Sequence, residues 1–180
     1  SFVTPEEASN ALSNLHAPMG VYAVLGNHDW WLDANRVQRA LQSNNITVLE
    51  DASQLIHSGI CSLRLVGISD FWEGAHDIEK AVRNAGHDES ILAFTHNPDI
   101  FPELPANFSL TVAGHTHGGQ VHIPAIGRPI IPSQYGERYA IGHIIENESH
   151  LYVSPGIGTS IIPVRFLVPP EVTIIEVSNR

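Results

Sequence analysis

The sequence predicts one domain of the α/β or layered α+β class. Segments typical of strands and helices alternate through the first half, and the second half consists mostly of strand-like runs. With 180 residues and 43% hydrophobic content, the chain fits a single compact domain over residues 1–180 better than two. No apolar run reaches the roughly 18 residues of a membrane span.

The first elements are indicated by capping residues. Thr4, followed by Pro5 and by Glu7 three positions later, predicts a helix that runs to about Leu15. The run GVYAVLGNHD then reads as a buried strand. Asp33 is a suitable cap for a second helix, which has apolar residues at helical spacing.

Further elements follow in the middle of the chain. NITVLED predicts a short strand, and SQLIHSGICSLRLVGISD predicts a hairpin that turns at Ser58 and Gly59. Cys61, the single cysteine, cannot form an internal disulfide and is expected to fill the core. A third helix is expected from Asp77 to Ala85, and Gly86 would end it. Five strand-like runs come after it: SILAFTHN, SLTVAGHTH, ERYAIGHII, HLYVSPG and EVTIIEV.

The charge balance limits the possible ligands. Nine Lys and Arg against nineteen Asp and Glu give a formal net charge of −10. Because Lys and Arg hold phosphate backbones, this balance argues against a general affinity for nucleic acid. A small phosphorylated ligand is compatible with it where a metal supplies positive charge.

Histidines follow three of the apolar strands. VYAVL ends in GNHD, ILAFT ends in THN, and LTVA ends in GHTH. The ligand crevice of open α/β sheets lies beyond the carboxyl ends of the strands. We therefore expect five side chains to surround one point: Asn27, His28, His96, His115 and His117.

These residue types favour a transition metal. Imidazole nitrogen with an amide oxygen suits zinc, manganese or iron(II) better than calcium. His115 and His117 would share one face of a continuing strand, or would face two adjacent ions if the chain turns at the glycines. A single histidine in such a place is most often just hydrogen-bonded. The grouping of several favours metal binding.

His28 is a candidate general acid. A histidine beside a metal centre, with the Asp29 carboxylate able to orient its ring, can protonate a leaving alkoxide near neutral pH. In the alternative interpretation Asp29 only caps the following helix and His28 is solvated.

GNHD, THN and GHTH, in this order, resemble the later motifs of the calcineurin-like metallophosphoesterases. The similarity is greatest to a small bacterial branch of phosphohydrolases in which GHTHGGQ is followed by proline-rich loops and a characteristic ending. Here that ending is GIGTS at 156–160, PVRF at 163–166 and PPE at 169–171. The resemblance covers essentially the whole chain.

The resemblance implies a layered α/β/β/α sandwich and an enzyme that hydrolyses small phosphomonoesters or phosphodiesters. A hydroxide bridging two divalent ions (Mn, Fe or Zn) would attack phosphorus, with His28 as the acid. His117 would bind the first ion. The second ion would be bound by Asn27, His96 and His115.

Two motifs of the family, Asp-x-His and Gly-Asp, do not occur where the resemblance requires them. The resemblance therefore implies a chain that lacks the first strand and crossover helix of the fold, so that His117 is the one remaining ligand of the first ion. We expect this chain alone to be inactive or weakly active, with one or no tightly bound ion, because two close dications without a bridging anion repel.

Other interpretations stay open. One is a non-catalytic fragment that binds a metal or a partner, and another is a single-zinc protein built on His96, His115 and His117. The sheet edge exposed by a missing strand would allow homodimers. The expected location is the cytoplasm or the periphery of the inner membrane.

Several residues outside the motifs are weaker candidates. Asp70, Phe71 and Trp72 follow a strand and can line a substrate pocket, although packing is the more common role of such aromatics. Arg128 and Arg165 can bind a substrate phosphate or form surface ion pairs.

Overall fold

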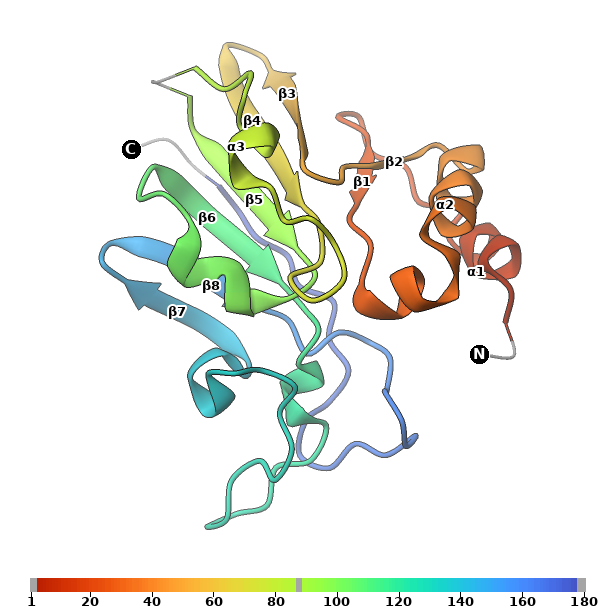
Figure 1. The fold of residues 1–180 in the computed structure, drawn as a ribbon, viewed down its shortest axis with the longest axis vertical. Helices are drawn as coiled ribbons and strands as arrows, with labels where there is room; N and C mark the ends of the chain where they lie inside the picture. The colour runs from red at the N-terminus through yellow and green to blue at the C-terminus, as the bar shows by residue number, and fades with distance from the viewer. Residues whose placement is uncertain (1–2, 87–88, 178–180) are drawn as a thin grey trace.

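Two β-sheets lie side by side in the computed structural model, which describes residues 3–86 and 89–177 (Figure 1). The small sheet has two parallel strands, β1 (Val21–Ala23) and β2 (Ile46–Val48). The large sheet has six strands in the order β3-β4-β5-β6-β8-β7. Helices α1 and α2 flank the small sheet on the side away from the large one. The predicted α/β class is confirmed.

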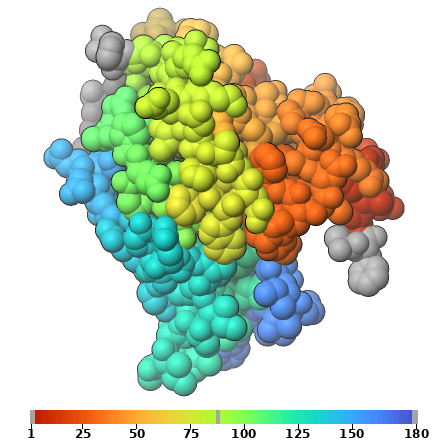
Figure 2. Space-filling view, viewed as in Figure 1, coloured from red at the N-terminus to blue at the C-terminus, as the bar shows by residue number. Residues whose placement is uncertain are grey.

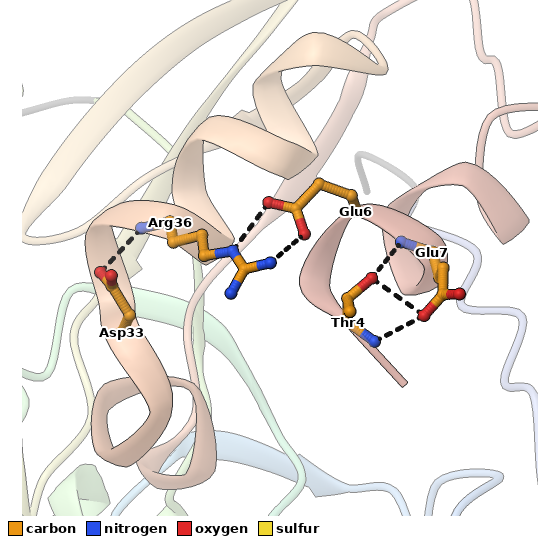
Figure 3. Close-up of polar contacts among 5 residues, drawn as sticks. All are labelled: Thr4, Glu6, Glu7, Asp33 and Arg36. Atoms are coloured by element: carbon orange, nitrogen blue, oxygen red, sulfur yellow. Dashed lines mark hydrogen bonds and ion pairs between the residues drawn. The ribbon is translucent and has the colours of Figure 1, made fainter. Parts of the chain in front are cut away.

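Helix α1 (Pro5–Ala11) begins where the capping signal predicts. The Glu7 N–H donates to Thr4 Oγ1 at 3.2 Å, and the Thr4 N–H donates to Glu7 Oε2 at 2.8 Å (Figure 3). The helix ends at Ala11 rather than near Leu15. An ion pair of 2.7 Å between Glu6 and Arg36 joins α1 to α2.

Helix α2 (Asn27–Ser43) starts earlier than predicted and is kinked at Asp33. Asp33 Oδ1 accepts the Arg36 N–H at 3.0 Å, so this residue caps the second segment as expected (Figure 3). The first segment has its own cap, because Asp29 Oδ2 accepts the Gly26 N–H at 2.8 Å. The extra turn places Asn27 at the amino end of the helix, directly beyond β1.

The hairpin of the large sheet consists of β3 (Ala52–Ser58) and β4 (Cys61–Ile68). Ser58 pairs with Cys61, so the turn lies at Gly59 and Ile60, one residue later than predicted. The prediction that Cys61 fills the core is wrong: its side chain is exposed, because this end of the hairpin projects past the packed part of the sheet.

Four neighbouring strands of the large sheet run parallel: β4, β5 (Ile91–Thr95), β6 (Phe108–Ala113) and β8 (Ser149–Val153). Strand β7 (Gly142–Glu146) pairs antiparallel with β8 at the edge. The parallel arrangement brings four carboxyl ends to one edge of the sheet. The predicted strand EVTIIEV is wrong: residues 171–177 have no ladder partner among the described residues.

Short helices connect the strands. Helix α3 (Ile78–Ala81) is shorter than the predicted 77–85 segment and is capped by Asp77, whose Oδ1 accepts the Lys80 N–H at 2.9 Å. The 3₁₀ helices are η1 (Pro98–Glu103), η2 (His117–Gly119) and η3 (Gly136–Tyr139). The largest core cluster, with α3 and η1 packed on the large sheet, is formed by Val66, Ile68, Ala81, Ile91, Ala93, Ile100 and Phe108.

The two sheets are in direct contact. A Cβ on Gly67 in β4 would lie 2.3 Å from the Leu49 carbonyl oxygen, so only glycine permits this approach. Beside it, Asp51 Oδ1 accepts both the N–H and the hydroxyl of Ser69, at 3.0 and 2.9 Å. Long loops extend beyond the carboxyl ends of the strands, at the lower end of Figures 1 and 2. Within the described ranges, no helix is long and apolar enough to cross a membrane.

Candidate metal centre

Three side chains meet where β1, β5 and β6 end. Asn27 Oδ1 lies 3.1 Å from His96 Nε2, and His96 Nε2 lies 3.0 Å from His115 Nδ1. His96 directly follows β5, and His115 comes two residues after β6. The Gly114 N–H donates to the His96 carbonyl at 3.0 Å, which fixes the two loops against each other.

The backbone is shaped to admit these rings. A Cβ on Gly26 would lie 2.7 to 2.9 Å from three atoms of the His96 imidazole, so only a hydrogen fits there. His115 and His117 have φ values of 66° and 51°, in the left-handed region that side chains other than glycine seldom adopt. Such backbone strain is concentrated at functional sites.

Burial keeps the paired histidines neutral. Loss of solvent, reinforced by nearby imidazoles, lowers the pKa of His96 to about 4. Burial also lowers the pKa of His115 to about 4. A neutral imidazole has a free lone pair, which is the form that binds metals.

The donor atoms of this cluster fit a metal ion. Ligand atoms about 2.1 Å from a tetrahedral or octahedral ion lie about 3.0 to 3.4 Å from one another, close to the two contacts of 3.0 and 3.1 Å. In the described ranges, no group of three or more His, Cys, Asp or Glu side chains is arranged to hold a metal ion. The third side chain of the cluster is Asn27, whose amide oxygen lies 3.1 Å from His96 Nε2.

His117 lines the same pocket but does not touch the other donors through a hydrogen bond. Its Nδ1 lies 3.3 Å from the Gly158 carbonyl oxygen, and its own carbonyl accepts from Arg165 Nη1 at 3.4 Å. Burial lowers its pKa. His117 therefore shares the pocket with Asn27, His96 and His115, and its Nδ1 contacts the C-terminal loop.

His28 and Asp29 face different surroundings. His28 is exposed and lines the pocket, with its ring centroid 4.8 Å from that of Trp31. Asp29 caps α2 by accepting the Gly26 N–H. Among the described side chains, no hydrogen bond joins Asp29 to His28. The structure thus gives Asp29 the capping role of the alternative interpretation. An orienting role toward His28 has no contact to support it.

The pocket around these residues has a volume of about 440 Å³, which is in the range for small-molecule sites. Two tryptophans form part of its wall. The Trp72 ring lies edge-on to the His115 ring with centroids 4.4 Å apart. Trp31 Nε1 donates to Glu73 Oε1 at 2.8 Å, which connects α2 to the loop after β4. Thr159, Ser160 and Ile161 complete the wall from the C-terminal loops.

Asp70 lies behind His115 and is fully buried. Its Oδ1 accepts the N–H groups of Trp72 and Glu73, both at 3.0 Å. Its Oδ2 and the Nε2 of His115 are both buried without a hydrogen-bond partner, and the Asp70 charge acts on His115. Metal-bound histidines commonly direct their second nitrogen to a carboxylate. The sequence offered only the position after a strand as a signal for this residue.

The two candidate arginines are engaged elsewhere. Arg128 forms an ion pair of 2.7 Å with Glu137. Arg165 donates to main-chain carbonyls, among them Gly158 at 3.0 Å and Pro155 at 2.7 Å. Neither arginine lines the pocket, so their observed contacts hold loops together.

Comparisons with known proteins give relatives over nearly the whole chain. YkuE of Bacillus subtilis, an uncharacterized metallophosphoesterase, is 31% identical over 173 residues, which cover 93% of this chain and 59% of YkuE. Phosphodiesterase YaeI of Escherichia coli is 33% identical over 174 residues, covering 93% of this chain and 62% of YaeI. YkoQ of Bacillus subtilis, another uncharacterized metallophosphoesterase, is 29% identical over 175 residues, with coverage of 91% and 62%.

The chain thus spans 59% to 62% of the length of these relatives. No family model matches it, and no solved structure matches it. Over about nine-tenths of its length, the sequence relatives of this chain are metallophosphoesterases.

Proposed function

We propose that this chain is part of a metallophosphoesterase that hydrolyses small phosphomonoesters or phosphodiesters. The observation that carries the proposal is the cluster of Asn27, His96 and His115 inside a pocket, in which Asn27 Oδ1 and His115 Nδ1 lie 3.1 and 3.0 Å from His96 Nε2. Neutral imidazoles with an amide oxygen suit manganese, iron or zinc. The layered α/β/β/α sandwich of that family is part of the same proposal.

Asn27, His96 and His115 would hold one ion, and His117 would contribute to a second whose further ligands come from outside these 180 residues. Divalent ions held there would neutralise phosphoryl oxygens and lower the pKa of a water. The protein's own contribution is to orient the donors. Gly26 and the left-handed backbone at His115 fix two of the rings.

His28 is the proposed general acid. Its exposed ring lies at the pocket wall, where a leaving-group oxygen can reach it from solvent. Packing against Trp31 limits the positions of the ring. Donating a proton to the leaving oxygen prevents an alkoxide from forming, which is the usual role of a histidine acid.

Turnover of bis-p-nitrophenyl phosphate with manganese tests the activity. We expect the 180-residue chain to be inactive or weakly active, and a longer chain that supplies Asp-x-His and Gly-Asp motifs to be active. In the longer chain, His115→Ala should lower the rate at least about 100-fold, whereas the control His143→Ala, in edge strand β7, should leave it unchanged. Full turnover by the 180-residue chain would contradict the proposed need for further ligands.

A single-ion site is the second candidate. The hydrogen bond of His117 to Gly158 favours one ion, held by Asn27, His96 and His115. Metal content after dialysis separates the candidates. Two ions per longer chain support the phosphoesterase. One tight ion that remains in both the 180-residue chain and the longer chain supports a mononuclear protein.

The free edge of β1 suggests a homodimer, also as a proposal. Strand β1 pairs only with β2 among the described residues, and its three residues are half-buried. Unpaired strand edges recruit other chains. Sedimentation velocity of the chain with and without Tyr22→Pro would show whether dimers depend on this edge.

A further inference from the structure

An apolar groove adjoins the candidate metal centre on the side of His117. It has a volume of about 290 Å³ and lies between the loop at 129–132 and the loop at 160–162. Both loops belong to the lower end of the molecule in Figure 1. Its apolar lining side chains are Val121, Pro129, Ile130, Pro132, Ile161 and Ile162.

The groove and the pocket adjoin each other. Four residues line both of them: His117, Pro132, Ser160 and Ile161. A group attached to a phosphate in the pocket would therefore have the groove beside it. The groove volume is near the lower limit of about 300 Å³ for small-molecule pockets, which suits one hydrocarbon chain better than a large head group.

Several apolar side chains that line the groove are exposed to solvent when no ligand is bound. Ile161 is 98% exposed, and Ile130 and Ile162 are 75% and 55% exposed. Ile161 also has a φ of 65°, a conformation in which a β-branched residue is a clear outlier. Among the described residues, the groove lining contains no Lys, Arg, Asp or Glu, so an anionic ligand group would find no charged partner in it.

Hydrogen bonds from the side chain and main chain of Gln120 hold the walls of the groove in place. Gln120 Oε1 accepts the Ser160 N–H, and Gln120 Nε2 donates to the Ile162 carbonyl at 3.3 Å. The Phe166 N–H donates to the Gln120 carbonyl at 2.9 Å. These bonds join the loop after η2 to the 160–166 segment. These hydrogen bonds thus hold Ile161 and Ile162 in place before a ligand binds, which reduces the entropy lost on binding.

From these observations we infer that the groove binds the alkyl or acyl chain of an amphiphilic phosphoester while its phosphate occupies the pocket. The inference rests on the proposed function and names the substrate class of that site. The proposed ligand is a soluble phosphoester that carries one hydrocarbon chain. Binding of the isoleucine surface to a bilayer is an alternative that the test must separate.

Calorimetric titration with methyl, butyl, hexyl and octyl phosphate, each below its micelle concentration and with manganese present, tests the inference. Burying each methylene should tighten binding by up to about fourfold, until the groove is full. Ile130→Asn, at a residue that lines the groove but not the pocket, should weaken octyl phosphate about tenfold while leaving methyl phosphate unchanged. The matched control is Ile60→Asn, at a hairpin turn residue that is fully exposed, and it should change neither.

The outcomes distinguish the groove from the metal centre. If affinity does not depend on chain length, or if both isoleucine variants behave alike, the groove assignment is wrong even when methyl phosphate binds with manganese. If methyl phosphate binding is indifferent to manganese and to His115→Ala, the proposed function fails, whereas the groove predicts a surviving dependence on chain length. Binding to phosphatidylcholine vesicles without any dependence on chain length would identify a bilayer surface and overturn the inference.

Discussion

His96 Nε2 and His115 Nδ1 lie 3.0 Å apart, and no carboxylate stands between the two rings. Two imidazoles at this distance cannot both be protonated without strong repulsion. Burial has the same effect, since it lowers the pKa of each to about 4. The pair is therefore prepared to donate lone pairs at neutral pH, and Asn27 supplies the oxygen beside it.

Gly26→Ala should disrupt this pair without removing a donor. The new methyl group would lie within 2.9 Å of the His96 ring, so the ring must move. We expect a loss of stability of about 1 to 3 kcal/mol and manganese binding that is at least about tenfold weaker by calorimetry. Gly114→Ala is the matched control, because its Cβ would meet only the His96 carbonyl at 3.9 Å. Equal effects of the two substitutions would contradict the proposed close approach.

Asp70→Asn tests whether the buried carboxylate positions His115. Asparagine retains Oδ1, which accepts the Trp72 and Glu73 N–H groups, and removes only the charge. We expect metal affinity to fall about 10- to 100-fold, with an unchanged far-ultraviolet circular dichroism spectrum. The readout is the dissociation constant of zinc from competition with a chelating dye. If the Asp70→Asn variant binds zinc with wild-type affinity, Asp70 only stabilises the turn after β4.

Glu50 should make the fold less stable at neutral and alkaline pH. Burial raises its pKa from 4.5 to about 7, although Oε1 accepts the Leu25 N–H at 2.7 Å. Because its pKa is raised in the folded state, protonated Glu50 makes its full contribution to stability below pH 4.5. This contribution declines as the pH rises to 7 and is then lost. Glu50→Gln should therefore gain up to about 3 kcal/mol over wild type between pH 4.5 and 8, measured by urea unfolding. Glu103→Gln, on an exposed residue, should show no such gain.

The paired histidines should have the opposite effect in the same pH window. Their folded-state pKa values of about 4 lie below the ordinary histidine value of 6.5, so protons favour the unfolded chain. Their stabilising contribution is full above pH 6.5 and declines as the pH falls toward 4.

Unfolding in EDTA with Glu50→Gln protein isolates the histidine effect, because the opposing glutamate is absent. Adding His115→Asn should reduce the loss of stability between pH 6.5 and 4.5 by up to about 2 to 3 kcal/mol. An identical pH dependence with and without His115 would mean that this imidazole is solvated.

The fold could be predicted where local signals act alone. Thr4 starts α1 and Asp33 caps the second part of α2, because a capping side chain needs only its own neighbours. The first turn of α2 is not predicted, since GVYAVLGNHD reads as one strand until the contact between Asp29 and Gly26 shows that a helix begins there. The 171–177 run has strand composition, but composition does not supply a partner edge.

The candidate site was predictable from strand ends, and its surroundings were predictable only in part. Asn27, His96 and His115 each follow an apolar strand, and the parallel sheet brings such positions together. The contact of His117 Nδ1 with the Gly158 carbonyl joins residues that are 41 positions apart in sequence. Asp70 and Trp72 contact the site only because β4 neighbours β5, a pairing that no short motif encodes.

The donor set also crosses the boundary between the sheets. Asn27 belongs to the β1–α2 unit, whereas His96 and His115 follow strands of the large sheet. An ion bound by all three would be released whenever either unit opened. Metal concentration would then control the cooperativity of unfolding: saturated protein should melt in one transition, and chelated protein should allow the small-sheet unit to exchange its amide hydrogens first.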